Sequence, residues 1–425
     1  MTIIHVQIEQ HEPLLLGDAS GTGPYQETAD YIPGGVVRGA VAERLLAGCT
    51  SRGHLDDHRG CPDRAGCPFW RVFGGEVGPE PLFGNAYPAQ TGPAYPFPAT
   101  ARTCKRHPGF TNPKAKDRCE EHHEVFDTLV RQFVYELVSD PQFPHRERLL
   151  PELGRRWARL AGHYEPCCPK PECGAGVVQA EGYYAAPRDE PGYAERPWLG
   201  RATHVGINRE RGVAEDALLF TQETIQPRDG VSFWARVVAD PAYVETLEKV
   251  LFGEHEIGRG RSRGMGKVAI SAGTVEGIYT VADRVELFDA AVKGEIARYG
   301  QQAGEGTYLA LTLRADAVLT RAGLPASRPE PEDLELPADT VRVRAWARTT
   351  VAGGWHGAAR MPYRTRQAVE RGAVYLFHAP GGIDQDRLVG RLEELERTGI
   401  GEWRERGCGQ VTVCAPFHYR LMGPA

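Results

Sequence analysis

A short glycine-rich motif occurs twice in this chain of 425 residues. IGRGRSRGMGKV at residues 257–268 and IGEWRERGCGQV at residues 400–411 share the pattern I-G-x5-G-x-G-x-V. Each copy follows a segment with helical periodicity and precedes a short run of strand-forming residues. A repeated unit of helix, loop and strand is typical of a duplicated fold. The repeat therefore predicts two copies of one α+β domain, over residues 1–275 and 276–425.

The segments around the two motifs have periodic apolar positions. Alternating apolar residues from Ile4 to Ile8 predict an opening strand. Three helices are predicted from apolar residues three or four positions apart, which are Val37, Val41 and Leu45, then Val244, Leu247 and Leu251, and finally Leu388, Leu392 and Leu395. Strand-like runs at residues 203–210, 217–225 and 231–238 predict a β-hairpin that rejoins the parent sheet.

Residues 49–200 lack this regularity and are rich in proline, glycine, histidine and cysteine. The clear helical pattern in this segment is HEVFDTLVRQFVYELV at residues 123–138, and ERLLPELGRRWARLAG at residues 147–162 is a weaker second one. We interpret the segment as an insertion into the first domain.

The overall charge does not point to a polyanion as partner, because 50 Lys and Arg residues face 56 Asp and Glu residues. Any surface for nucleic acid must therefore be local. The sequence has no apolar run of about 20 residues, which a membrane helix needs, and its N-terminus lacks a basic head followed by an apolar stretch. We expect a cytoplasmic protein without contact to a membrane.

The glycine motifs are not nucleotide-binding loops of the common kinds. They lack the Gly-Lys-Ser/Thr ending, and they lead from a helix into a strand, the reverse of a dinucleotide fingerprint. Exposed backbone amides beside cations suit a phosphodiester chain, which makes the first motif a candidate RNA cradle with Gly258, Arg259, Arg261, Arg263, Gly264, Gly266 and Lys267. Glu402 and Glu405 make the second copy less suitable. The alternative is a structural turn with solvated arginines.

A second basic stretch spans residues 341–369 and contains no acidic residue. Its arginines are Arg342, Arg344, Arg348, Arg360, Arg364 and Arg366. Trp346, Trp355 and Tyr363 are interleaved with them and offer flat faces on which unpaired bases can stack. The stretch either binds RNA or forms a strand pair with a solvated basic face.

Ten cysteines are too few for a disulfide scaffold in a chain of this length. Cys168 and Cys173 in CPKPEC have a knuckle-like spacing, and with Cys104 and His123 they predict a Cys3His zinc site. Cys119 and Cys167 are competing ligands, and buried free thiols are the alternative. A second cluster of possible ligands comprises Cys49, His54, His58, Cys61 and Cys67.

Several motifs together resemble the RAMP superfamily of CRISPR-associated proteins, which are RNA-binding subunits. These motifs are YIPGGVVRGAVAERL, LFGNAYP, HVGINRERGVAEDALLFTQE and the two glycine loops. GDASGTGPYQETADYIPGGVVRGA and CKRHPGF followed by HEVFDTL look more narrowly like the large five-group RAMP subunit of type III-D effectors. The resemblance implies two ferredoxin-like (RRM-like) domains, and it places RNA against Gly34, Gly35 and Arg38 at the start of a helix.

The resemblance also implies a non-catalytic role. The chain would bind the 5′ handle of the guide RNA (crRNA) and contact the polymerase-like large subunit and the backbone RAMP subunits, with target RNA bound only indirectly. Asp18 is the one weak candidate for a cleaving residue, since His5, His204 and His356 have no evident partners in the sequence. The alternatives are a RAMP endoribonuclease that processes guide RNA or cuts target RNA, and a purely structural scaffold.

Overall fold

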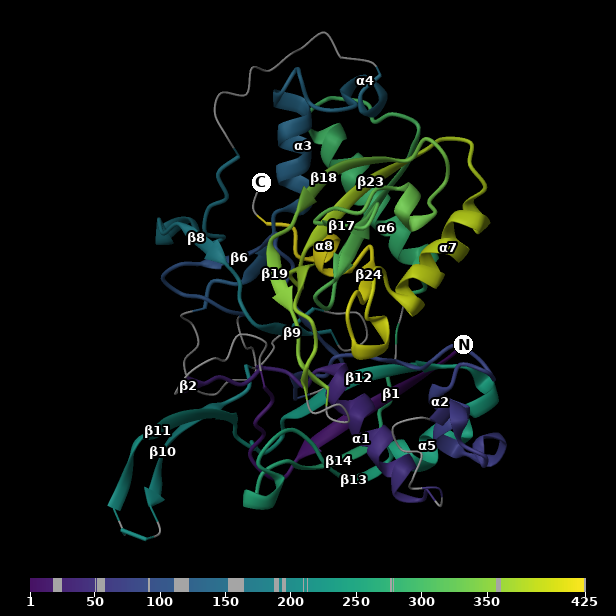
Figure 1. Ribbon diagram of the computed structural model, residues 1–425. Coiled ribbons are helices and arrows are strands. Elements are labelled where there is room, and N and C mark those ends of the chain that lie inside the picture. The colour runs from purple at the N-terminus through teal and green to yellow at the C-terminus, as the bar shows by residue number, and fades with distance from the viewer. Residues whose placement is uncertain are drawn as a thin grey trace.

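The computed structural model describes residues 1–17, 25–49, 51, 58–90, 92–110, 122–151, 164–186, 191–192, 196–208, 210–211, 213–275, 277, 279–356 and 361–423. Two units, each built on an antiparallel sheet, lie one above the other in Figure 1, and the N-terminus belongs to the lower one. Smaller sheets flank them. The predicted α+β class is confirmed. Among the described helices, none combines the length and apolar character needed to cross a membrane.

The first unit is a sheet with strand order β13-β14-β1-β12-β3, and β4 also pairs with β12. Its elements are β1 (Thr2–Gln10), α1 (Gly34–Ala47), α2 (Pro68–Phe73), β3 (Leu82–Phe83), β4 (Tyr87–Ala89), β12 (Ser232–Ala239), α5 (Val244–Leu251), β13 (Gly253–Glu256) and β14 (Lys267–Ala272). The apolar faces predicted for β1, α1 and α5 meet in one hydrophobic cluster. The spacing of the apolar residues in the sequence agrees with their burial in the structure, because each of these elements has a single buried face.

The second unit repeats the strand order of the first. Its sheet runs β24-β15-β23-β18, which corresponds to β14-β1-β12-β3 of the first sheet, where β13 is added beside β14. The elements are α6 (Val281–Arg298), β15 (Gly306–Leu313), β18 (Val341–Trp346), β23 (Val374–Pro380), α7 (Gln385–Thr398), β24 (Val411–Val413) and α8 (Phe417–Arg420). Leu388, Leu392 and Leu395 of α7 are buried, as their spacing predicts.

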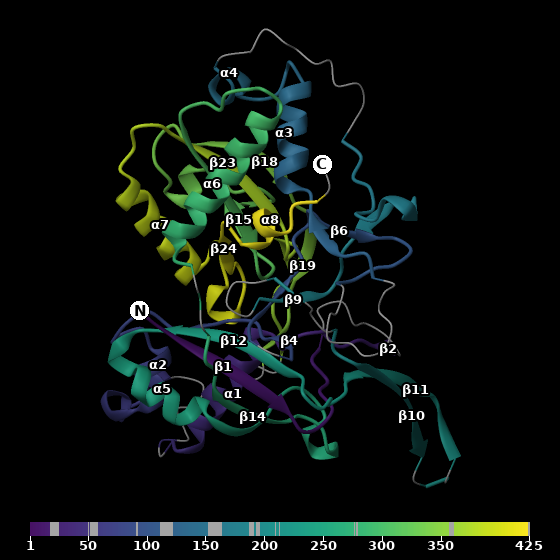
Figure 2. The same cartoon turned by 180° about the vertical axis from the view of Figure 1, so that it is seen from behind.

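Part of the cysteine-rich segment packs into this second unit. The predicted helix at residues 123–138 is a strand, β7 (Val125–Asp127), followed by α3 (Leu129–Ser139). α3 lies beside α6 in both views (Figures 1 and 2), and its apolar face belongs to the hydrophobic cluster of the second sheet. The ring of Phe133 lies 5.7 Å from that of Tyr308 on β15. α4 (Arg146–Leu149) follows, and residues 152–163 of the weaker helical pattern lie outside the described residues.

Several short strands form small sheets outside the two large ones. Their strands are β2 (Tyr25–Gln26), β5 (Ala94–Pro96), β6 (Ala101–Cys104), β8 (Val177–Gln179), β9 (Tyr183–Ala185), β10 (Leu199–Asn208), β11 (Val213–Ile225), β16 (Leu319–Arg321), β17 (Leu324–Ala326), β19 (Thr349–Ala352), β20 (Trp355–His356), β21 (Met361–Pro362) and β22 (Arg366–Val369). The hairpin β10–β11 does not rejoin the parent sheet, because it pairs with β2 and projects from the molecule. Only β12 of the three predicted runs lies in that sheet.

The two glycine loops, residues 257–266 and 400–409, have the same backbone conformation. The amide of Ile257 donates to the carbonyl of Gly266 at 2.9 Å, and the amide of Ile400 donates to that of Gly409 at 2.8 Å. Four matched positions have positive φ in each loop, and Trp403 (φ 60°) stands where the first loop has Gly260 (φ 79°). At the first and last glycines of this pattern, Gly258 and Gly266 with their counterparts Gly401 and Gly409, glycine is required mainly because a backbone carbonyl oxygen lies where a Cβ would stand.

Two glycines of the first loop should therefore respond differently to alanine. Gly264 has open space around it, so an alanine there would only have to adopt the left-handed conformation. Gly264→Ala is therefore expected to lower the free energy of unfolding by about 1 kcal/mol. A Cβ on Gly266 would lie 2.5 Å from the carbonyl oxygen of Ile257, so Gly266→Ala should cost about 3 kcal/mol. Urea denaturation of both variants measures the difference, and equal losses would contradict this conformation.

Candidate nucleic-acid interface and metal centre

A hairpin from the second unit brings the predicted RNA-binding segments together. β19–β22 and β20–β21 form this hairpin extension, which is described at residues 349–356 and 361–369. It runs from the upper unit toward the lower one in Figure 1. At its far end, the guanidinium carbon of Arg259 lies 5.9 Å from the ring centroid of Trp355, which is 53% exposed. The first glycine loop thus meets the hairpin extension.

The second glycine loop lies against the same hairpin extension. The guanidinium of Arg406 is 3.7 Å from the ring centroid of Tyr363 and 5.1 Å from that of Trp403. Arg366 pairs with Glu402 at 3.1 Å, and Arg406 pairs with Glu405 at 3.2 Å. The charges of these two arginines are therefore balanced by protein carboxylates, as the acidic residues of this loop suggest.

Cations and aromatic rings from three segments share this region, which we call the basic-aromatic surface. It comprises Arg259, Trp355, Tyr363, Arg366, Trp403 and Arg406, and we include Arg263 of the same glycine loop and Arg364 of the same hairpin extension. Arg263 and Arg364 are exposed, and neither guanidinium group forms an ion pair or hydrogen bond within the part of the chain that the structure describes. These two guanidinium groups can contact phosphate without first breaking a protein contact.

The other basic candidates already have protein partners. In the first loop, Arg261 pairs with Glu43 at 2.8 Å and Lys267 with Glu254 at 3.3 Å. In the second basic stretch, Arg342 pairs with Glu330 at 2.6 Å, Arg344 pairs with Glu136 at 3.0 Å, and Arg348 contacts Gln179. Arg360 lies outside the described residues. Arg342, Arg344 and Arg348 are therefore already paired within the protein.

The start of α1 is covered by the second glycine loop. The Gly34 amide donates to Oδ1 of Asn85 at 2.8 Å, and a Cβ on Gly35 would lie 3.6 Å from the Cβ of Arg406. Arg38 pairs with Glu80 (Nε to Oε1 2.6 Å) and lies over the ring of Phe73. The Gly34 amide and the Arg38 guanidinium therefore already have protein partners, and Gly35 packs against Arg406 of the basic-aromatic surface.

Cys104, His123, Cys168 and Cys173 come together as the sequence predicts. One ligand atom from each lies within 4.8 Å of all the others, and this is the one such group within the described residues. The sulfur atoms of Cys104 and Cys173 are 3.7 Å apart, and Nδ1 of His123 is 3.2 Å from the sulfur of Cys168. A disulfide bond is about 2.05 Å, whereas Zn–S bonds of about 2.3 Å give a tetrahedral edge of about 3.8 Å.

The surroundings of this Cys3His cluster suit a bound metal. It joins the three-stranded sheet β7-β6-β8 to the loop before Cys173, and the His107 amide donates to the Cys104 sulfur at 3.4 Å. Such hydrogen bonds orient thiolate ligands. Burial raises the pKa of the Cys168 thiol to about 11, so a nearby cation is needed to favour its thiolate at neutral pH. The cluster could hold a metal ion.

The competing ligands are placed elsewhere. Cys167 is exposed and lies outside the cluster, and Cys119 lies outside the described residues. Cys49, His58, Cys61 and Cys67 are described but do not gather into a metal site. His54, the remaining member of the second predicted cluster, falls in the part of the chain without a description.

The weak catalytic candidates do not form a site among the described residues. Asp18 and the side chain of His356 lie outside them. Burial, with Arg236 and Arg314 nearby, lowers the pKa of His5 to about 4, so this ring is neutral at physiological pH. His204 stacks against Phe220 in the projecting hairpin, with 5.2 Å between ring centroids.

Sequence reasoning missed a buried Asp-His-Thr arrangement. His418 on α8 contacts the carboxylate of Asp127 through Nδ1 and lies 2.7 Å from the hydroxyl of Thr312 through Nε2. All three side chains are buried, so no substrate reaches them. The arrangement ties β7 of the cysteine-rich segment to the second sheet. Nothing in the sequence links these residues, because each stands alone in its own element.

A second missed junction links three parts of the chain. Arg371 pairs with Asp30 at 2.9 Å, Tyr183 donates to the same carboxylate at 2.7 Å, and the guanidinium lies 4.7 Å from the ring of Tyr31. These residues lie before α1, on β9 and before β23. The junction therefore ties the segment before α1 in the first unit to the segment before β23 in the second.

Several solved structures align with this chain at low sequence identity. They include a Type III-B Cmr-beta complex bound to cognate target RNA and AMPPnP (10% identity, 88% of this chain and 86% of that chain, TM-score 0.40). They also include a Csm3-Csm4 subcomplex of a type III-A interference complex (10%, 89% and 94%, TM-score 0.32) and a Cas6 product complex (16%, 52% and 82%, TM-score 0.28). These TM-scores carry no functional argument.

Sequence comparison gives a more definite result. No curated protein matches the chain. The family model described as "CRISPR-associated protein (Cas_Cmr3)" matches residues 186–415, more than half of the chain, and the matched range includes the projecting hairpin, the hairpin extension and both glycine loops. The predicted kinship with CRISPR-associated RAMP proteins is thereby confirmed at the level of the family. The chain belongs to the Cas_Cmr3 family of CRISPR-associated proteins.

Proposed function

We propose that the chain is a non-catalytic, guide-RNA-binding subunit of a type III CRISPR interference complex, and that the RNA follows the basic-aromatic surface. The observation that carries the proposal is that Arg259 of the first glycine loop and Arg406 of the second meet Trp355 and Tyr363 of the hairpin extension, although the three segments are far apart in the sequence. Exposed cations beside aromatic rings suit single-stranded RNA, whose unstacked bases need flat partners and whose phosphates need positive charge.

The finer assignments follow from the sequence resemblance and belong to the same proposal. We interpret both units as ferredoxin-like (RRM-like) domains, in keeping with their shared strand order. The subunit would hold the 5′ handle of the guide, contact the polymerase-like large subunit and the backbone RAMP subunits, and serve a type III-D complex. The metal in the Cys3His cluster would be a structural zinc ion.

Purification of the assembled complex through a tag on this chain, followed by sequencing of the retained RNA, tests the proposal. We expect repeat-derived handles at the 5′ ends of the protected fragments. Random RNA, or no RNA, would contradict guide binding and leave the scaffold role. Cleavage of a repeat-containing RNA at one site by the isolated chain would replace the proposal with the endoribonuclease alternative.

A further inference from the structure

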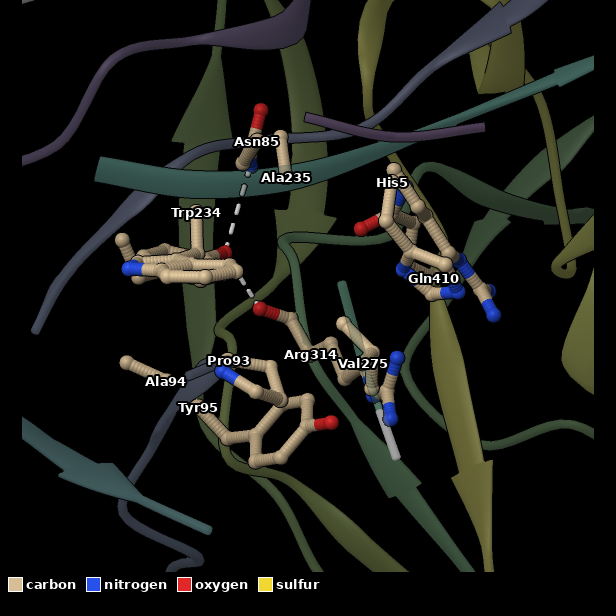
Figure 3. A pocket seen from close by; sticks show the side chains of 12 residues that line it. His5, Asn85, Pro93, Ala94, Tyr95, Trp234, Ala235, Val275, Arg314 and Gln410 are labelled. Carbon is tan, nitrogen blue, oxygen red and sulfur yellow. Dashed lines mark hydrogen bonds between the residues drawn. The ribbon is translucent and has the colours of Figure 1, made fainter. Parts of the chain in front are cut away.

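A pocket lies between the two units. His5 on β1 and Trp234 and Arg236 on β12 line it from the first sheet, and Arg314 and Gln410 line it from the second unit. Figure 3 shows the side chains of His5, Trp234, Arg314 and Gln410 around this space. Its volume is about 40 Å³, which is room for several water molecules or one small ion.

The lining of this interdomain pocket is positively charged. Two arginines line it, and no Asp or Glu is among the lining residues. The nearby carboxylate is Glu396, which already pairs with Arg284 at 2.8 Å and accepts the Val413 amide at 2.8 Å. Burial opposes the charge of Glu396, but Arg284 and Arg314 hold its pKa below the ordinary value. The carboxylate of Glu396 therefore faces the three guanidinium groups of Arg236, Arg284 and Arg314.

Arg236 has donor capacity that the protein leaves unused. Its side chain is buried with 9% exposure, and one terminal nitrogen donates to the backbone carbonyl of Glu396. Its Nε is buried and has no hydrogen-bond partner. A buried charge that lacks full pairing is costly, and an anion in the pocket would supply both the missing charge and the missing acceptor. His5, being neutral, adds a hydrogen-bonding group without adding charge.

We propose that the interdomain pocket binds a tetrahedral oxyanion of the phosphate class, held by Arg236 and Arg314. The anion is either free inorganic phosphate or a phosphate group of bound RNA, and the pocket chemistry is the same for both. By joining groups from β12 and from the end of β15, it would stabilise the contact between the two units.

The test uses the full chain without RNA and compares inorganic phosphate with chloride at equal ionic strength. We expect phosphate to raise the unfolding midpoint saturably by about 2 °C, because it binds only the folded state. Gln410→Glu places a carboxylate in the pocket, and should raise the midpoint in chloride and abolish the phosphate response. Gln142→Glu, the same change at an exposed position on the far side of α3, should respond to phosphate like the native chain.

Two outcomes would overturn the proposal. One is a native chain whose midpoint does not respond to phosphate. The other is a Gln410→Glu chain that responds as much as the native chain, since general salting effects act on both alike. If Gln410→Glu does not fold, equilibrium dialysis of radiolabelled phosphate against the native chain decides, with about one bound phosphate per chain expected and none contradicting the pocket.

A further arm with saturating guide RNA distinguishes the two sources of phosphate, and it alone rests on the proposed function. A phosphate response lost in the presence of RNA identifies an RNA phosphate in the pocket. A response that persists identifies free phosphate. Failure to bind RNA would refute the proposed function while leaving the phosphate titration of the RNA-free chain intact as a test of the pocket.

Discussion

Replacing Arg259, Arg263 and Arg364 together with alanine is expected to weaken binding of single-stranded guide RNA about 100-fold, at on the order of 1 kcal/mol or more per lost contact. These arginines lie on the basic-aromatic surface, and Arg263 and Arg364 have no ion-pair partner among the described residues. Each phosphate contact releases counterions, so the plot of log affinity against log salt should become less steep by about 2. Fluorescence anisotropy at several salt concentrations measures both effects.

A matched variant removes the same charge elsewhere. Lys249, Arg298 and Arg387 lie on α5, α6 and α7 with exposed side chains, and their joint replacement with alanine should leave the salt dependence of RNA binding unchanged. Equal losses of RNA affinity in both triple variants would mean that the change in overall charge causes the effect. An unchanged slope of log affinity against log salt in the variant of Arg259, Arg263 and Arg364 would mean that these residues do not contact the RNA.

Cys168→Ser is expected to abolish binding of about one zinc ion per chain and to unfold the sheet β7-β6-β8 locally. Structural zinc sites contribute about 10–16 kcal/mol of apparent binding free energy to folding. The cores of the two large units do not depend on this cluster, so they should remain folded. Elemental analysis gives the metal content, and hydrogen exchange shows which amides of residues 101–127 and 164–179 lose protection.

Cys167→Ser is the control, because this neighbouring thiol is exposed and lies outside the cluster. It should retain the metal and the protection of the sheet. Native protein that contains no metal and shows full protection of these amides would contradict the zinc site. Equal metal loss in both variants would mean that the wrong thiol is assigned.

The metal ligands and the glycine loops could be predicted because their signals are local. Cys168 and Cys173 are separated by four residues in a knuckle-like segment, and the two loops repeat one pattern of glycines with positive φ. The helical faces of α1, α5 and α7 follow from apolar spacing for the same reason. Each signal lies within about one element, where backbone geometry restricts which residues fit.

The assembly of the site could not be predicted, because it depends on contacts between distant segments. Apolar spacing shows which face of α3 is buried but not that this face packs against α6 of the second unit. The pairing of Arg371 with Asp30 and the stacking of Arg259 on Trp355 join single residues from unrelated elements. The sequence also did not indicate that the amide of Gly34 is already bonded to Asn85.

Ultraviolet cross-linking of the guide RNA to the full chain, followed by mass spectrometry of the modified peptides, tests directly whether the RNA follows the basic-aromatic surface. Aromatic rings that stack on bases are the groups expected to form adducts. We expect nucleotide adducts at Trp355 and Tyr363 of the hairpin extension, and we expect them to be lost in the triple variant of Arg259, Arg263 and Arg364. Adducts confined to the projecting hairpin β10–β11, with none on the hairpin extension, would contradict this path of the RNA.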